Sequence, residues 1–178
     1  MLEKLPGKNL VLERLKDSDS ESIYQAVVSS KKEISPWLNW LDSSYNKQSC
    51  DDFIRLQKIN WESNLEYTYS IKDPSNQIMG MIGLHIFDLQ NDVASIGYWM
   101  NTEYTGKGLC TEALMLLVEN SLIPLNLIRI ELVIAISNIA SQKVARKAGA
   151  TYEAEIKNRL RLNGSPISAQ IYSFCPSN

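Results

Sequence analysis

The sequence predicts one mixed α/β (α+β) domain, built on a central sheet with helices packed against it. Short runs of alternating apolar and polar residues, typical of strands, are separated by longer stretches of helical periodicity. A nearly continuous apolar run over residues 127–136, rich in β-branched side chains, is typical of a central strand covered on both faces. Between residues 95 and 117 a strand leads through a glycine-bearing turn into a strongly apolar helix. The predicted order is β, helices, βββ, α, β, α, ββ.

Length and composition limit the classes of protein to which the chain can belong. Its 178 residues fit a single domain spanning 1–178, with apolar and charged contents of 44% and 21% that are ordinary for a globular protein. The net charge of −2 without a basic run argues against a nucleic-acid partner. No signal-like or membrane-spanning run occurs, so no membrane association is expected. Three widely separated cysteines without metal-ligand spacing indicate reduced thiols, a cytoplasmic location and no metal site.

The N-terminal part predicts a strand followed by helices. Residues 9–15 alternate polar and apolar and predict a strand. Asp17–Ser20 supplies N-cap chemistry for a helix over about 21–29, and a second helix is predicted over 49–60.

Between these helices, residues 31–42 crowd apolar side chains around Pro36, among them Trp37 and Trp40. We expect a short helix whose tryptophans complete the core, because large apolar residues are usually buried. The alternative is the wall of a substrate cleft, since aromatic residues on irregular segments often line pockets.

The remaining pattern predicts strands joined by turns and one further helix. Three strands follow in succession over 66–72, 77–87 and 93–100, and Gly97 inside the third indicates a bulge or a close backbone approach. Asn138 is a natural N-cap for a helix that Gly149 ends. Two last strands, over about 150–162 and 167–174, are joined at Asn163-Gly164, which is a hairpin signal.

The turn at Gly106-Lys107-Gly108 predicts an anion site. Glycines there leave backbone N–H groups free of neighbouring Cβ atoms, and the N-terminus of the following helix adds unpaired donors and a partial positive charge. Two glycines flanking one lysine suit a pyrophosphate.

Several motifs stand in register along nearly the whole chain: Pro36-Trp37-Leu38-Asn39-Trp40, Ile96-Gly97-Tyr98-Trp99, Gly106-Lys107-Gly108-Leu109-Cys110-Thr111-Glu112-Ala113, Asn138-Ile139-Ala140-Ser141-Gln142-Lys143-Val144-Ala145 and Lys147-Ala148-Gly149. With the element order, they resemble the GNAT superfamily of acyl-CoA-dependent N-acyltransferases. Within it, the chain is similar to the branch of the ribosomal-protein-alanine N-acetyltransferases. The resemblance implies a mostly antiparallel sheet with two central strands splayed apart to admit acetyl-CoA.

The resemblance also implies roles for single residues. The turn would hold the pyrophosphate of acetyl-CoA through backbone amides, the strand edge would bind pantetheine, and the start of the later helix would lie beside the thioester. The implied cofactor-binding residues are Trp99, Met100, Gly106, Lys107, Gly108, Leu109, Cys110, Thr111, Asn138 and Ser141. Lys143 and Arg146 are assigned to the solvated face of a helix, with contact to the outer phosphate as the alternative.

Two catalytic roles are predicted beside the thioester. The Ser141 hydroxyl is the candidate proton donor to the departing thiolate, and the alternative is that it only satisfies donors in the first turn of its helix. A backbone N–H near Trp99 or Met100 would polarise the thioester carbonyl.

The chain departs from the family pattern at several positions. Ser95 stands where many relatives carry a glutamate that serves as general base, and Glu103 stands where arginine or glutamine is favoured. Ala150 and Ser168 replace the usual phenylalanine and aspartate. These departures leave the fold and the cofactor site intact and leave the general base unassigned.

The absence of a glutamate base at position 95 affects which acceptor amine is favoured. Deprotonating a lysine of pKa about 10.4 at pH 7 costs about 4.6 kcal/mol, whereas an α-amino group of pKa about 7.7–8.0 costs about 1 to 1.4 kcal/mol. With Ser95 in place of a carboxylate, the favoured acceptor is a protein or peptide N-terminal amine. A small amine (a polyamine or aminoglycoside) and a non-catalytic acyl-CoA-binding module are the alternatives.

Other reactive residues are predicted to be structural. His85, the single histidine, is expected to be packed or at the surface, because no partner stands at motif spacing. Cys110 is expected to be a small core residue and Glu112 to favour the helix dipole. Glu153 and Glu155 could supply a carboxylate, which the sequence alone does not orient.

Assembly is a further expectation from the resemblance. Relatives often dimerise, so a homodimer is one possible assembly. Its contact could be formed by Tyr67, Tyr69 or the terminal strands.

Overall fold

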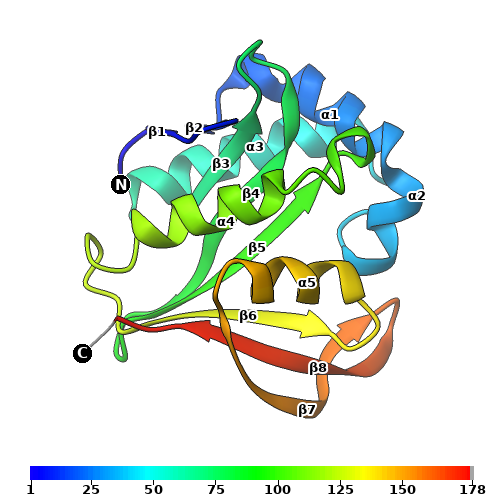
Figure 1. The fold of residues 1–178 in the computed structure, drawn as a ribbon. Helices are drawn as coiled ribbons and strands as arrows, with labels where there is room; N and C mark the ends of the chain where they lie inside the picture. Colours follow the sequence, from blue (N-terminus) through cyan, green and yellow to red (C-terminus); the bar gives the residue numbers. More distant parts are fainter. Residues whose placement is uncertain (177–178) are drawn as a thin grey trace.

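The computed structural model describes residues 1–176, without the side chains of residues 86 and 87. One sheet runs in the order β1-β2-β3-β4-β5-β6-β8-β7 (Figure 1). Its strands are β1 (Lys4–Pro6), β2 (Val11–Arg14), β3 (Tyr67–Lys72), β4 (Ile78–Asp88), β5 (Val93–Met100), β6 (Arg129–Ala135), β7 (Thr151–Leu162) and β8 (Ser165–Phe174). The β5–β6 pair is parallel and the other neighbours are antiparallel, which confirms the predicted mixed, mostly antiparallel sheet.

Helices cover both faces of this sheet. The α-helices are α1 (Ser20–Ser29), α2 (Lys31–Ile34), α3 (Lys47–Glu62), α4 (Leu109–Glu119) and α5 (Ile139–Lys147), and short 3₁₀ turns span η1 (Asp17–Asp19), η2 (Ser35–Trp37) and η3 (Thr102–Tyr104). In Figure 1, α4 and α5 lie in front of the sheet, and α1 and α3 lie behind it. None of the helices within residues 1–176 is long and apolar enough to cross a membrane.

The central strands β5 and β6 separate soon after they pair. Their register covers only Val93–Ser95 against Arg129–Glu131, so residues 96–100 have no partner strand on that side. Figure 1 shows the two strands diverging like a V, with α4 and α5 both beginning at its open end. The predicted splay is therefore present, and it brings two helix N-termini to one place.

The signals for α4, α5 and the last hairpin are confirmed, whereas Asp19, the N-cap of α1, makes no side-chain cap hydrogen bond. Gly108 is the N-cap of α4. Asn138 caps α5, where its Oδ1 accepts a hydrogen bond from Ser141 N at 3.1 Å. Gly149, with φ +88°, follows the end of α5. Asn163 and Gly164, with φ +48° and +78°, make the tight turn of the β7–β8 hairpin.

The tyrosines of β3 do not face solvent. All six residues of β3 are buried, because α3 covers one face of the strand and the other face also lies in the core. Tyr67 and Tyr69 are 4% and 0% exposed and pack edge-on against Trp61. The expectation that they supply a dimer contact is therefore wrong. The three-residue strand β1 was not predicted, because it is too short to show an alternating pattern.

The expected burial of both tryptophans around Pro36 is also wrong. Among the apolar residues of this segment only Ile34 and Leu41 are buried, whereas Trp40 is 49% exposed and Trp37 is half-buried. The segment folds as the single turn α2 followed by η2 and then runs along the surface, so it has too little helix to turn its aromatic side chains inward. The cleft-wall interpretation fits these residues instead.

Candidate active site

Two cavities of about 460 and 480 Å³ meet along the end of β5. The first, here called the turn cavity, lies among η2, η3, α4 and α5 and includes the turn at residues 105–111. The second, here called the aromatic cavity, lies among α1, residues 38–45, α3, β3 and β4. Leu38, Tyr98 and Trp99 line both cavities, so a molecule in one meets a molecule in the other at this strand end.

The turn cavity contains the exposed N-terminus of α4. Gly106 and Gly108 have φ of +75° and +80°, and a Cβ added at either position would meet nothing within 4 Å. No side chain caps α4. The amides of residues 109–111 therefore donate to no acceptor within the described chain. These free donors, at the positive end of a helix dipole, form an anion-binding surface.

The structure brings together all but one of the residues predicted to bind the cofactor. The turn cavity is lined by Trp99, Met100, Gly106, Gly108, Leu109, Cys110, Thr111, Asn138 and Ser141. Lys107 does not line the cavity, and its Nζ lies 5.3 Å from the centroid of the Tyr104 ring.

Basic side chains of α5 divide between the cavity and the sheet. Lys143 and Lys147 line the turn cavity. Arg146 instead donates from Nη1 to Tyr172 Oη, on β8, at 3.1 Å. Lys143 and Lys147 therefore add positive charge beside the α4 N-terminus, and Arg146 does not.

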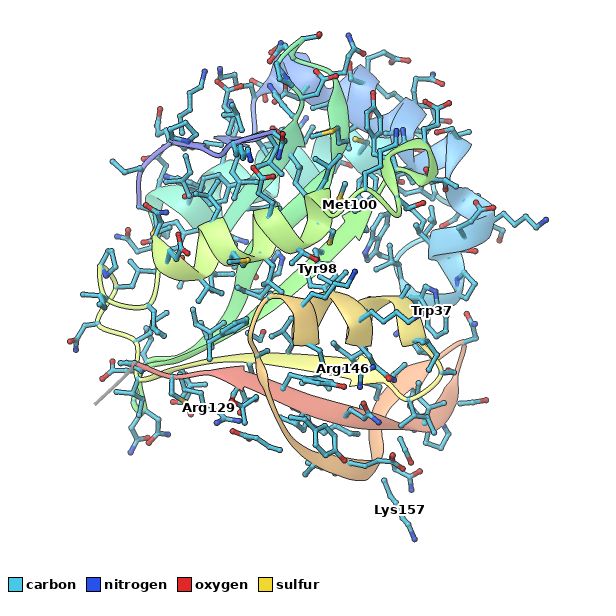
Figure 2. The ribbon with its side chains drawn as sticks, in the orientation of Figure 1. Trp37, Tyr98, Met100, Arg129, Arg146 and Lys157 are labelled. Carbon is cyan, nitrogen blue, oxygen red and sulfur yellow. The ribbon has the colours of Figure 1, made fainter. Side chains whose placement is uncertain are left out.

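Tyr98 joins the two sides of the splay, a role that sequence reasoning did not assign. Its hydroxyl donates to Ser141 O at 3.1 Å, which ties β5 to the first turn of α5. Burial raises the pKa of Tyr98, so the phenol stays protonated. Tyr98 and Met100, labelled in Figure 2, both lie on the part of β5 that has left β6.

The Ser141 hydroxyl is not used in capping. Asn138 accepts from the Ser141 amide, and the Ser141 carbonyl accepts from Tyr98. Ser141 lines the turn cavity, and its side chain also hydrogen-bonds Tyr98, which acts to lower the pKa of that phenol against the larger effect of burial. Its hydroxyl therefore stands beside Tyr98 at the wall of the turn cavity, where it can meet a ligand.

The aromatic cavity has apolar walls and a small polar region. Ile23, Val27, Trp40, Tyr45, Phe53 and Met81 supply most of the apolar walls. The rings of Trp40 and Tyr45 lie 5.5 Å apart, in a tilted arrangement. This aromatic pair is what the cleft-wall interpretation of residues 31–42 requires.

The polar region consists of Gln57, Glu66, Thr68 and His85. Glu66 Oε2 accepts from Gln57 Nε2 at 2.9 Å and from Asn60 Nδ2 at 3.1 Å. His85 Nδ1 lies 3.7 Å from the same Glu66 oxygen. Burial lowers the pKa of His85, and the Glu66 carboxylate acts in the opposite direction.

The sequence predicted no partner for His85, because Glu66 stands 19 positions earlier, just before the neighbouring strand β3. The only sequence signal was the pair of glycines, Gly83 and Gly97, that face each other across β4 and β5. Gly97 itself is regularly paired with Gly83 and has no backbone close to it, so the predicted bulge or close backbone approach is wrong, and what lies over Gly97 is the His85 ring.

The other candidate residues have structural roles. Glu112 accepts from the backbone and side-chain nitrogens of Asn9, both at 2.8 Å, and so joins α4 to the chain before β2. Glu153 pairs with Arg129 and accepts from Ser173, which lowers the pKa of this carboxyl to about 2. Burial raises the pKa of the Cys110 thiol to about 12, as for a packed side chain. Within residues 1–176, no three His, Cys, Asp or Glu side chains are grouped to hold a metal ion.

Comparison with known proteins gives consistent matches over nearly the whole chain. The sequence model of the family described as the acetyltransferase (GNAT) domain matches residues 9–151. YdaF of Bacillus subtilis, provisionally named a ribosomal N-acetyltransferase, is 25% identical over 171 residues, or 94% of this chain and 92% of the relative. The ribosomal-protein-serine acetyltransferase of Escherichia coli is 20% identical over 167 residues, or 94% and 93% of the two chains.

A solved structure shares the whole architecture. RimL, a ribosomal L7/L12 α-N-protein acetyltransferase in complex with coenzyme A, superimposes with a TM-score of 0.90 at 22% identity. The superposition covers 97% of this chain and 98% of that one. At this identity the likeness shows a common fold.

Proposed function

Because the chain belongs to the GNAT acetyltransferase family, we propose that its acceptor is the N-terminal amine of a protein or peptide. The family makes the chain an acetyl-CoA-dependent N-acetyltransferase. The proposal for the acceptor is supported by one observation above all. An anion-binding cavity and an apolar cavity meet at Tyr98 and Trp99, so two substrates can approach one strand end from different sides.

The residues around the turn cavity suit acetyl-CoA, which supplies the activated acetyl group when bound. The free amides of residues 109–111 and the open glycine turn match a pyrophosphate. Lys143 and Lys147 lie where they can pair with a further phosphate. The unpaired edge of β5 near Trp99 and Met100 offers backbone groups to the amide-bearing pantetheine arm.

Two groups assist the transfer itself in this proposal. A backbone N–H of the unpaired edge near Trp99 or Met100 polarises the thioester carbonyl. The Ser141 hydroxyl, at the wall of the turn cavity, donates to the departing sulfur and delivers a proton to it. Tyr98 is a positioning residue, since its bond to the Ser141 carbonyl fixes the first turn of α5 against β5.

The acceptor side favours a peptide end over a polycation. Its walls are apolar and aromatic, and Glu66 is the one charged side chain among the described residues that line it. Such a cavity suits an amine carried on a chain with apolar side chains, because burial of those side chains supplies binding energy. A polyamine or aminoglycoside would need several acidic partners for its several charges.

An acceptor screen tests this proposal. Two peptides of the same composition are compared, one with a free N-terminus and no lysine, the other with a blocked N-terminus and one lysine, together with spermidine and an aminoglycoside. We expect kcat/KM with acetyl-CoA to be highest for the free N-terminus. Preference for the lysine peptide or a small amine would contradict the proposed acceptor, and tight CoA binding without any turnover would indicate a binding module.

Three further expectations accompany this function. We propose that residues 1–178 work as one domain and that the protein acts in the cytoplasm, where its three free thiols remain reduced. With Tyr67 and Tyr69 buried, a homodimer would need another contact, for which the exposed strand β7 is the remaining candidate from the sequence.

A further inference from the structure

We propose that His85, oriented by Glu66, accepts the proton that the acceptor amine must lose. This inference rests on the proposed acetyl transfer and adds to it the base that the sequence left unassigned. The imidazole lies in the aromatic cavity, on β4, directly opposite Ser95 of β5.

Two glycines leave room for the His85 imidazole ring on one face of the sheet. His85 is the direct cross-strand partner of Ser95, and Gly83 is the partner of Gly97. A Cβ added at Gly97 would lie 3.4 Å from His85 Cδ2 and 3.8 Å from Nε2, and one at Gly83 would lie 3.0 Å from Cε1. The ring therefore lies over both glycines, and a side chain at Gly83 would crowd it, whereas one at Gly97 would make ordinary contact.

The two ring nitrogens face different surroundings. Nδ1 lies on the side of Glu66, and Nε2 lies on the side of Gly97. Gly97 lines the aromatic cavity and directly precedes Tyr98, where the two cavities meet. With its hydrogen on Nδ1, toward the carboxylate, the ring presents the lone pair of Nε2 on the side where acceptor and acetyl group meet.

Glu66 is itself held in place. Gln57 and Asn60 donate to its Oε2, and Thr68 Oγ1 donates to Gln57 Oε1 at 2.8 Å. Gln57 and Thr68 are buried. The carboxylate is thus fixed by neutral donors rather than neutralised by a lysine or arginine, so its charge remains available to orient the imidazole and to attract an ammonium group.

The charges around His85 suit a proton acceptor. The titratable groups that share its cavity are Glu66 before β3, Tyr98 on β5, Tyr45 before α3 and Cys50 on α3. Burial raises the pKa of Tyr45, Tyr98 and Cys50, so all three stay neutral near pH 7. Burial lowers the pKa of His85 more than Glu66 raises it, which leaves the imidazole neutral at that pH.

The reaction balances with this assignment. The amine nitrogen forms a bond to the acetyl carbon, and the bond between that carbon and the CoA sulfur breaks. The proton lost by the amine passes to His85 Nε2, directly or through one water. The sulfur leaves with the bonding pair and takes a proton by way of Ser141, and His85 later releases its proton to solvent.

The first test uses the fact that His85 is the only histidine in the chain. In tag-free protein, NMR titration of the imidazole reports this residue alone. We expect a pKa below the ordinary value near 6.5, a hydrogen on Nδ1 at pH 7.5, and a further fall of the pKa in the Glu66→Gln variant. A pKa above 7.5, or no response to Glu66→Gln, would overturn the proposal.

The second test measures turnover with the best acceptor peptide. His85→Gln is expected to lower kcat about 10²- to 10³-fold and to remove the acidic limb of the pH–kcat profile, with an unchanged Kd for CoA. For His85→Ala, added imidazole is expected to restore part of kcat, which a merely structural role would not allow. Glu66→Gln is expected to shift the acidic limb and to lower kcat less than His85→Gln does.

The outcomes separate this inference from the proposed function. Unaltered kcat and an unaltered acidic limb in His85→Gln would overturn the role of His85 while acetyl transfer stands. Absence of turnover by the unaltered protein on every amine would overturn the proposed function and this step with it.

Discussion

Ser141 has two roles on different atoms: its backbone amide joins the cap of α5, and its hydroxyl lies at the wall of the turn cavity. Removing the hydroxyl in Ser141→Ala should therefore leave the cap intact and lower kcat on the order of 10²-fold, because the departing sulfur loses its proton donor. Steady-state kinetics checks this, and the KM for acetyl-CoA should stay within about two-fold. A kcat equal to that of the unaltered protein would leave Ser141 with only its structural part.

Lys72 is the charged residue most deeply enclosed by partners of opposite sign. Its side chain is 4% exposed, and its Nζ lies 2.8 Å from both Glu13 Oε2 and Asp19 Oδ1. Lys72→Met should lower the free energy of unfolding by about 3–5 kcal/mol, because the buried Asp19 carboxylate loses its cation and Glu13 keeps only Lys16. Urea denaturation at pH 7 measures the change.

The matched control is Lys58→Met. Lys58 also forms an ion pair at 2.7 Å, with Asp17, but both side chains lie largely in solvent. Its loss should cost less than about 1 kcal/mol. Equal losses in the two variants would show that the burial of the Lys72 cluster has no energetic consequence.

Among the elements, the turn into α4 is the one whose conformation is tied most directly to binding. Gly108→Ala forces a side chain into a left-handed residue with φ +80°, at a cost of about 1 kcal/mol, and points a methyl group into the open space of the turn cavity. We expect the Kd for acetyl-CoA to rise about ten-fold or more, measured by calorimetry.

Gly149→Ala is the control for this change. Gly149 has φ +88° and equally open surroundings, but it follows the far end of α5. It should lower stability by a similar amount and leave the Kd for acetyl-CoA unchanged. A weaker affinity in both variants would trace the effect of Gly108→Ala to general strain.

The elements also show what the sequence could and could not predict. Helices α4 and α5 and the β7–β8 turn were predictable, because glycine, asparagine and apolar periodicity act locally at their ends. The burial of β3 on both faces and the exposure of Trp40 were not, because each depends on which distant element covers the residue. The residues around the turn cavity could be predicted from the family motifs in the sequence. The Glu66–His85 contact could not, because it arises only when β3 and β4 pair.

At the scale of the whole molecule, stability should fall in acid. Hydrogen bonds from Lys16 and Lys72 lower the pKa of Glu13 from 4.5 to about 2. A carboxyl group with a lowered pKa in the folded state contributes stability that is complete above pH 4.5 and is lost as the pH falls toward 2. Urea denaturation at pH 7, 4 and 3 should show this decline.

The variant Glu13→Gln provides the comparison. It should be less stable than the unaltered protein at pH 7 and should lose less of its remaining stability between pH 4.5 and 3. An identical decline in both proteins would assign the acid sensitivity to other carboxylates.

The short pairing of β5 with β6 also has a kinetic consequence. Only three residue pairs join the β1–β5 part of the sheet to the β6–β8–β7 part, and residues 96–100 meet no strand on one side. Their outward amides should exchange with deuterium quickly in the free protein and slowly once acetyl-CoA lies along that edge. Slower exchange of these amides in the bound protein, measured by deuterium-exchange mass spectrometry, would show that the cosubstrate takes the place of a partner strand along β5. Its release would then loosen the contact between the β1–β5 and β6–β8–β7 parts of the sheet.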